Sequence, residues 1–84
     1  MPRIAAEIAR IDARGLYCPV PILRTRERLR ELTPGAVLEV LSDDPAILED
    51  MAAFCRSHGH DYLGHVEEPG KAWRVRLRKV GEPR

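Results

Sequence analysis

Four short stretches of the 84-residue chain are apolar or alternate apolar with polar residues, and two longer stretches repeat their apolar residues at helical spacing. A period of two predicts a β-strand, and a spacing of three and four residues predicts an amphipathic helix. Glycine and proline separate these stretches and mark their ends. The expected strands cover residues 7–12, 36–41, 61–67 and 72–80, and the expected helices cover residues 19–32 and 45–58.

The ends of the two helices are clearly marked. The first helix is expected to start with Pro19 and to stop at the Thr-Pro-Gly segment 33–35. The second helix has Asp44 as its expected N-cap and Pro45 at its first position, where the missing N–H costs nothing. Gly59 is expected to end it with a positive φ.

The strands differ in how many of their faces are apolar. Residues 36–41 are mostly apolar on both sides, which predicts a central strand. Residues 72–80 alternate, with Trp73, Val75 and Leu77 on one face and basic residues on the other, so one face of the sheet is solvated. The order of elements predicts an α/β fold of the α+β kind. The predicted architecture is a two-layer sandwich, β-α-β-α-β-β, with both helices on one face of a four-stranded mixed sheet.

The length of the chain allows one domain, residues 1–84 with a core of about 7–80, because no residues are left for a second hydrophobic core. It also excludes a cleft of enzyme size, so chemistry is expected on an exposed loop or helix end. Charged residues interrupt the apolar start that a signal peptide would need, and no apolar run approaches a membrane span. Two cysteines are too few for a disulfide framework. We therefore expect a cytoplasmic protein with reduced thiols and no membrane association.

The segment 14–21, Arg-Gly-Leu-Tyr-Cys-Pro-Val-Pro, is the most informative part of the chain. Cys18 is the expected N-cap of the first helix, where Ser, Thr, Asp and Asn are the usual residues. A thiol at a helix start and next to arginine has a lowered pKa, so we expect an exposed, rigidly held thiolate. The alternative is a buried cap cysteine that only packs. The residues expected to support the thiolate, with the N–H groups of Val20 and Ile22 as the main donors, are Arg14, Gly15, Pro19, Val20, Pro21 and Ile22.

The sequence lacks the motifs of other common cysteine sites and of phosphate-binding sites. The sequence has no C-x-x-C pair, no Ser or His close to Cys18 along the chain, and no glycine-rich phosphate loop. A lone activated thiol on a small domain suits a chemical group that is accepted, carried and handed on.

The segment around Cys18 resembles the signature of the TusA/SirA-like sulfur-carrier family, and the likeness extends over residues 11–66 in the same order and spacing. The further matching positions are Leu32-x-Pro34-Gly35, Asp43-Asp44-Pro45 with Asp50 following, Phe54-Cys55 and Gly59-His60. The resemblance implies the same β-α-β-α-β-β fold. It implies a carrier of sulfurtransferase type rather than an enzyme with its own substrate pocket.

The resemblance also implies a pathway. Cys18 would accept a sulfane sulfur as a persulfide from a cysteine desulfurase and deliver it to a sulfur-relay protein for tRNA 2-thiouridine formation. Other members of the family act in sulfur oxidation or molybdenum cofactor supply, and these acceptors stay open, as does a non-catalytic regulatory or interaction module. We expect no cofactor other than the covalent sulfur, and a monomer.

The net charge of +1 averages three blocks of different charge. Residues 1–35 carry seven Arg and four acidic residues, residues 36–68 carry one Arg and eight acidic residues, and residues 69–84 carry six basic residues and one acidic residue. An acidic protein partner is expected to dock on the basic residues nearest Cys18 in the sequence. These are Arg14, Arg24, Arg26 and Arg28.

Other candidate residues have simpler structural explanations. Cys55 lies on the apolar side of the second helix, so we expect packing first and a secondary thiol role second. With His58 and His60 it makes only three potential metal ligands, so no metal site is expected. Helix capping by Asp44 explains at least one of the two carboxylates at 43–44, and the pair has no partner for acid–base catalysis.

The basic residues of the last strand are the candidate for binding a phosphate backbone. They are Arg74, Arg76 and Arg78, with Lys71 and Lys79 beside them. The neighbouring Trp73 points to the other face, so no stacking platform is expected and direct nucleic-acid binding is disfavoured.

Overall fold

The computed structural model describes residues 8–81, which form six elements in the expected order. The elements are β1 (Ile8–Asp12), α1 (Val20–Glu31), β2 (Val37–Ser42), α2 (Ile47–His58), β3 (Asp61–Glu68) and β4 (Ala72–Arg78). Their ends lie within one or two residues of those expected from the sequence, and Glu7, the first residue of the first expected strand, lies outside the described residues. No helix within residues 8–81 is long and apolar enough to cross a bilayer.

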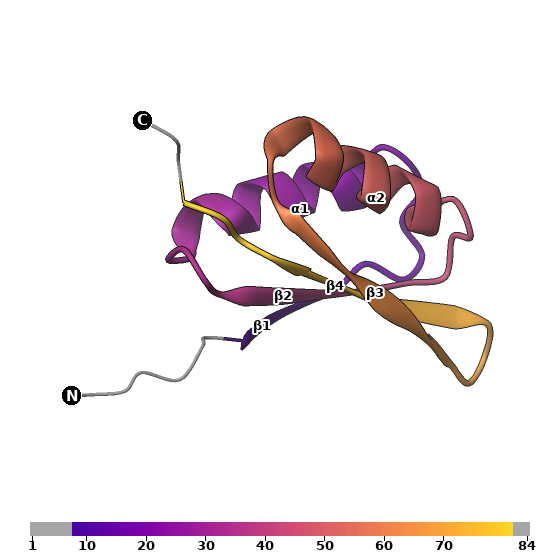
Figure 1. Cartoon of the computed structure of the whole chain (residues 1–84). Coiled ribbons are helices and arrows are strands. Elements are labelled where there is room, and N and C mark those ends of the chain that lie inside the picture. The colour runs from indigo at the N-terminus through magenta and orange to yellow at the C-terminus, as the bar shows by residue number, and fades with distance from the viewer. Residues whose placement is uncertain (1–7, 82–84) are drawn as a thin grey trace.

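The strands form one sheet in the order β1-β2-β4-β3. β1 and β2 are parallel, and the other two pairs, β2 with β4 and β3 with β4, are antiparallel. Both helices lie on the same face of this sheet (Figure 1). The predicted two-layer fold with a mixed sheet is therefore confirmed. The strand order, which the sequence left open, places β2 and β4 in the centre.

The hydrophobic core lies between the sheet and the helices. The central strands provide Leu38, Val40, Val75 and Leu77, all fully buried, which confirms the face assigned to β4. Burial of each such side chain contributes roughly 1.5–3 kcal/mol. The helices cover these strands with Leu29, Ile47, Met51, Phe54 and Cys55.

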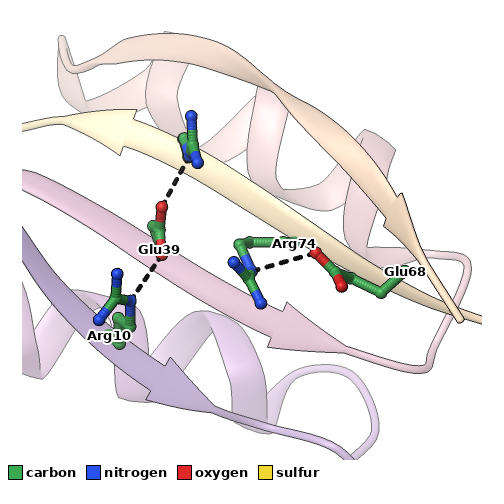
Figure 2. Close-up of polar contacts among 5 residues, drawn as sticks. Arg10, Glu39, Glu68 and Arg74 are labelled. Carbon is green, nitrogen blue, oxygen red and sulfur yellow. Dashed lines mark hydrogen bonds and ion pairs between the residues drawn. The ribbon is translucent and has the colours of Figure 1, made fainter.

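The other face of the sheet is open and carries ion pairs between strands (Figure 2). Glu39, the one charged residue of β2, is only 5% exposed. Its two carboxylate oxygens accept hydrogen bonds from the Nε atoms of Arg10 on β1 (2.8 Å) and Arg76 on β4 (2.7 Å). Arg74 pairs with Glu68 of β3 at 3.4 Å. Pairing on both sides is what allows a buried carboxylate at this position.

The start of α2 differs from the expectation. The helix begins at Ile47 with Ala46 as its N-cap, two residues later than the positions assigned to Asp44 and Pro45. The physical reason is a turn in front of the helix. Oδ1 of Asp44 accepts the N–H of Ala46 at 3.0 Å, and its carbonyl accepts the N–H of Ile47 at 2.9 Å. Asp44 thus still satisfies N–H groups at this end, and Gly59 ends the helix with φ 75° as predicted.

Candidate functional site

Cys18 lies on the connection between β1 and α1, and its side chain is exposed as predicted. Its assignment as the N-cap of α1 is wrong by one residue, because Pro19 occupies the cap and the helix begins at Val20. The cause is a turn over residues 17–20, closed by the N–H of Val20 donating to the carbonyl of Tyr17 at 2.8 Å. The sulfur therefore stands just ahead of the helix rather than on its cap.

Few N–H groups of the first helical turn are left for the sulfur. Pro19 and Pro21 have none, and Pro21 is fully buried. The N–H of Val20 is used by the turn, and the N–H of Leu23 donates to the carbonyl of Pro19 at 3.0 Å. Val20 therefore does not act as the predicted donor. Ile22 supplies the remaining N–H of this turn, and its side chain packs against the core.

Arg14 does not support the thiol as the sequence predicts. Its Nη2 lies 2.7 Å from Oδ2 of Asp12, and its Nε donates to Oδ1 of the same carboxylate at 2.9 Å. This two-point pair lowers the pKa of Asp12 to about 2. The same carboxylate raises the pKa of Arg14. Arg14, the cation closest to Cys18 in the sequence, is thus paired with Asp12 rather than with the thiol.

Three aspartates contact the Cys18 loop instead. The N–H of Gly15 donates to Oδ1 of Asp43 at 3.0 Å, and the N–H of Cys18 donates to Oδ2 of Asp44 at 3.4 Å. Asp50, in the first turn of α2, is the residue with the largest effect on the pKa of the thiol itself. Gly15 has a φ of 81°, a conformation that favours glycine at this position of the loop.

Two of these carboxylates, those of Asp50 and Asp44, raise the pKa of the Cys18 thiol, and the prediction of a lowered pKa is wrong. The hydrogen bond to Asp50 is the largest cause, because it stabilises the protonated sulfur. Partial desolvation and the negative charges of Asp50 and Asp44 act in the same direction. The sequence predicts a capping role for Asp44 alone and indicates no role in the chemistry for Asp43 or Asp50. The only signal for Asp50 was its place among the matching family positions.

The four arginines expected to form one basic face around Cys18 are divided among different parts of the surface. Arg24 and Arg28 line a cavity of about 220 Å³ on the side of α1 that faces Ile11. Arg26 lines a different cavity of about 160 Å³, together with residues at the end of α2 and with Lys79. The surroundings of Cys18 that the structure shows are acidic rather than basic.

Cys55 packs in the core, as expected for the apolar side of α2. It is 1% exposed, and burial raises the pKa of its thiol to about 11. His58 stacks on Phe54 with ring centroids 4.4 Å apart, while Nδ1 of His60 accepts a hydrogen bond from the backbone of Val80. Among the described residues, no group of three or more His, Cys, Asp or Glu side chains is placed to hold a metal ion.

The arginines of β4 all have carboxylate partners. The pairs are Arg74 with Glu68 at 3.4 Å, Arg76 with Glu39 at 2.7 Å and Arg78 with Asp61 at 3.5 Å. Lys79 donates from Nζ to the carbonyls of Leu29 and Leu32, at the end of α1. Much of the positive charge on this strand is therefore neutralised within the molecule, which favours a structural role over phosphate binding.

The fold is shared with a solved structure. The crystal structure of the SirA-like protein from Desulfitobacterium hafniense superposes with a TM-score of 0.77 at 26% sequence identity. The superposition covers 87% of this chain and 99% of that chain. This chain therefore has the fold of a SirA-like protein.

The sequence comparisons define the family. Residues 9–79 match the family model of sulfurtransferase TusA. The chain is 44% identical over 62 residues to sulfur carrier protein TusA of Pseudomonas entomophila, covering 74% of this chain and 78% of that protein. It is 41% identical over 61 residues to sulfur carrier protein TusA of Allochromatium vinosum, covering 73% and 80%. The match to YrkF of Bacillus subtilis is 44% over 72 residues, 86% of this chain but only 38% of that protein. This chain belongs to the TusA sulfurtransferase family.

Proposed function

We propose that this chain is a sulfur carrier that accepts a sulfane sulfur on Cys18 as a persulfide and delivers it to an acceptor protein. The observation that carries the proposal is the exposed Cys18 at the start of α1, within the Cys-Pro-x-Pro signature of a TusA family member. Relatives of similar sequence are named sulfur carrier proteins. Cys55 is buried, so Cys18 is the thiol that a partner can reach.

The proposed transfer follows thiol–disulfide exchange. The sulfur of Cys18 attacks the terminal sulfur of a donor persulfide, and a new S–S bond forms at Cys18. The S–S bond of the donor breaks, and the donor sulfur leaves with the electron pair as a thiolate. The proton of the Cys18 thiol is released to solvent. The step needs no bound cofactor and no metal ion.

Loading with a cysteine desulfurase and L-cysteine tests the carrier role. Intact mass spectrometry without reductant is expected to show a gain of about 32 Da, one sulfur atom, on the wild-type chain. Cys55→Ala is the matched control and is expected to load in the same way, whereas Cys18→Ala is expected to gain nothing. An equal adduct on Cys18→Ala, or no adduct on the wild type, contradicts the proposal.

For the acceptor, we propose the relay that thiolates tRNA uridine, supported by the resemblance to the TusA/SirA-like family. Cells that lack this chain are expected to lose 2-thiouridine from their tRNA, as quantified by mass spectrometry of nucleosides. Expression of the wild-type chain is expected to restore it, and expression of Cys18→Ala is not. An unchanged level of 2-thiouridine in the deletion strain rejects this acceptor and directs attention to sulfur oxidation or molybdenum cofactor supply.

A further inference from the structure

The cavity beside the last turns of α1 and α2 is lined by cations and, among residues 8–81, by no carboxylate. Its volume is about 160 Å³, and the polar side chains that line it are those of Arg26, Arg30, His58, His60 and Lys79. The other cavity on α1, by contrast, has both Glu27 and Glu31 in its lining. We propose that the first of these, the cationic cavity, is a binding site for the phosphate group of a small anionic ligand.

Arg26 and Arg30 supply most of the positive charge of the cationic cavity. They lie four residues apart on α1, so they share one side of the helix, and both side chains are exposed. Within residues 8–81 neither of them pairs with a carboxylate, whereas Arg28 of the same helix pairs with Glu31 at 2.8 Å. Like charges at this spacing destabilise a helix. An anion bound between the two guanidinium groups relieves that repulsion.

Hydrogen-bond donors cover the helix ends beside the cationic cavity. The last carbonyls of a helix carry a partial negative charge, which repels an anion when they are bare. At the end of α1, Nζ of Lys79 donates to the carbonyls of Leu29 at 2.7 Å and Leu32 at 2.6 Å. At the end of α2, Nδ1 of His58 donates to the carbonyl of Phe54 at 3.1 Å. A bound anion therefore meets donors and cations here rather than bare carbonyl oxygens.

The arrangement of the cations favours a phosphate group over a carboxylate. The cations come from three segments: α1, the end of α2 and the residue that follows β4. A phosphate group carries a charge of about −1.5 to −2 at neutral pH and three acceptor oxygens, so it accepts hydrogen bonds from several sides at once. A carboxylate has one charge and two oxygens in one plane. The cavity is smaller than the roughly 300–1,000 Å³ of a pocket for a drug-sized ligand, so it takes the phosphate group and leaves the rest of the ligand in solvent.

The cationic cavity is separate from Cys18 and from the arginines of β4. α1 and α2 follow the parallel strands β1 and β2 and run back along the sheet, so their last turns lie at the end opposite to the Cys18 loop (Figure 1). Arg30 is about 15 Å along the helix axis from Val20, at about 1.5 Å per residue. Each arginine of β4 has a carboxylate partner, and Lys79 keeps its structural role at the end of α1 while adding its charge. A phosphate bound in the cavity leaves the thiol accessible.

Titration of the full chain with inorganic phosphate tests this inference. Amide chemical shifts are followed by NMR, and sodium chloride of equal ionic strength is the reference. The wild type is expected to show saturable shifts at the ends of α1 and α2 and at Lys79, with a dissociation constant on the order of 1 mM. Arg26→Gln and Arg30→Gln are each expected to weaken binding at least about fivefold, because each removes charge-assisted hydrogen bonds. Arg24→Gln removes an exposed arginine of the same helix outside the cationic cavity, and as the matched control it is expected to change binding less than about twofold.

Two further ligands identify the chemistry of the site. Sodium acetate carries one charge and is expected to bind at least about tenfold more weakly than phosphate. Adenosine monophosphate carries the same phosphate group, so tighter binding than that of inorganic phosphate assigns the site to an organic phosphate ester, and equal or weaker binding assigns it to free phosphate. An absence of saturable shifts at the cavity in the wild type, an equal weakening in Arg24→Gln, or acetate binding as tight as that of phosphate overturns the inference.

The inference goes beyond the proposed function and does not depend on it. Phosphate binding is measured on the chain without sulfur and without a sulfur donor, whereas sulfur loading is scored on Cys18. A failure of either experiment therefore leaves the other conclusion standing.

Discussion

The two cysteines show how the surroundings of a side chain decide its chemistry. Cys18 is exposed and Cys55 is buried, and the pKa of each thiol is raised above its ordinary value. The causes differ, because a hydrogen bond to Asp50 comes first for Cys18 and burial in the core comes first for Cys55. The first cause can be removed by one substitution at the surface, whereas the second belongs to the packing of the fold.

The buried Cys55 predicts a loss of stability in alkaline solution. Its thiol keeps its proton in the folded chain up to a pKa of about 11, whereas in the unfolded chain it ionises near the ordinary value of 9.0. Between these values the unfolded chain binds fewer protons, so the free energy of unfolding falls as the pH rises. Urea unfolding followed by circular dichroism across this window measures the slope.

Substitution of each cysteine provides the control for this slope. Cys55→Ala is expected to show a flatter dependence than the wild type, and Cys18→Ala is expected to retain the slope that Cys55 causes. Equal slopes in Cys55→Ala and the wild type would show that the buried thiol does not titrate in the unfolding equilibrium.

For single residues, the sequence predicts those properties that depend on neighbours along the chain. The exposure of Cys18 follows from its loop, and the burial of Cys55 follows from helical periodicity. The pKa of Cys18 could not be predicted, because Asp44 and Asp50 are distant in the sequence and near in the fold. Arg14, the neighbour on which the prediction relied, has a better partner two residues away.

At the level of secondary structure, the pairing of the strands explains why the acidic residues lie near Cys18. β1 and β2 are parallel neighbours, so the connections that follow them leave the sheet side by side. The N–H of Ala13, just after β1, donates to the carbonyl of Leu41 at 2.7 Å, and Gly15 then binds Asp43. The carboxyl ends of adjacent parallel strands commonly form sites in α/β folds. The sequence does not give the strand order, so it does not predict that the segment 43–50 lies near Cys18.

The cross-strand ion pairs of Glu39 make a prediction for the sheet. Arg10 and Arg76 hold the pKa of Glu39 below its ordinary value of 4.5, with the hydrogen bond from Arg10 as the largest cause. The ionised carboxylate therefore stabilises the fold at neutral pH, and this contribution is lost as the pH falls through the lowered pKa. Glu39→Gln is expected to unfold at lower urea concentration than the wild type at neutral pH.

The pH dependence of this difference identifies its cause. The midpoints of Glu39→Gln and the wild type are expected to converge in acid, where the wild-type carboxylate is protonated. Glu67→Gln on β3 removes an exposed carboxylate and serves as the control, with little change expected at either pH. A difference between Glu39→Gln and the wild type that is constant with pH would assign the effect to packing rather than to charge.

Over the whole molecule, the net charge of +1 hides a separation of charge. Asp43 and Asp44, between β2 and α2, bind the backbone of the loop that carries Cys18. Arg26, Arg30 and Lys79 line the cavity beside the last turns of the two helices. The sequence predicts the acidic and basic blocks, but folding determines that the acidic block, rather than a basic one, meets Cys18.

The open face of the sheet predicts that the chain stays monomeric. Its exposed apolar side chains are kept apart, because Ile8 (58% exposed) lies on the edge strand β1 and Val66 (50% exposed) lies on the opposite edge strand β3. The ion pairs of Glu39 and Arg74 lie between them (Figure 2). The ladder of β3 is irregular between Tyr62 and Gly64, and such irregularities hinder the pairing of edge strands.

The proposed carrier role requires a surface that is free for docking, so self-association through this face would compete with that role. Light scattering after size-exclusion chromatography is expected to give a mass of 9.5 kDa that does not change with protein concentration. The measurement is repeated at a raised salt concentration as the control. Salt screens the ion pairs that lie between the apolar side chains of the two edge strands, so this is the condition that favours association. A mass twice that of the chain at low salt would show that the edge strands or the open face pair despite these features.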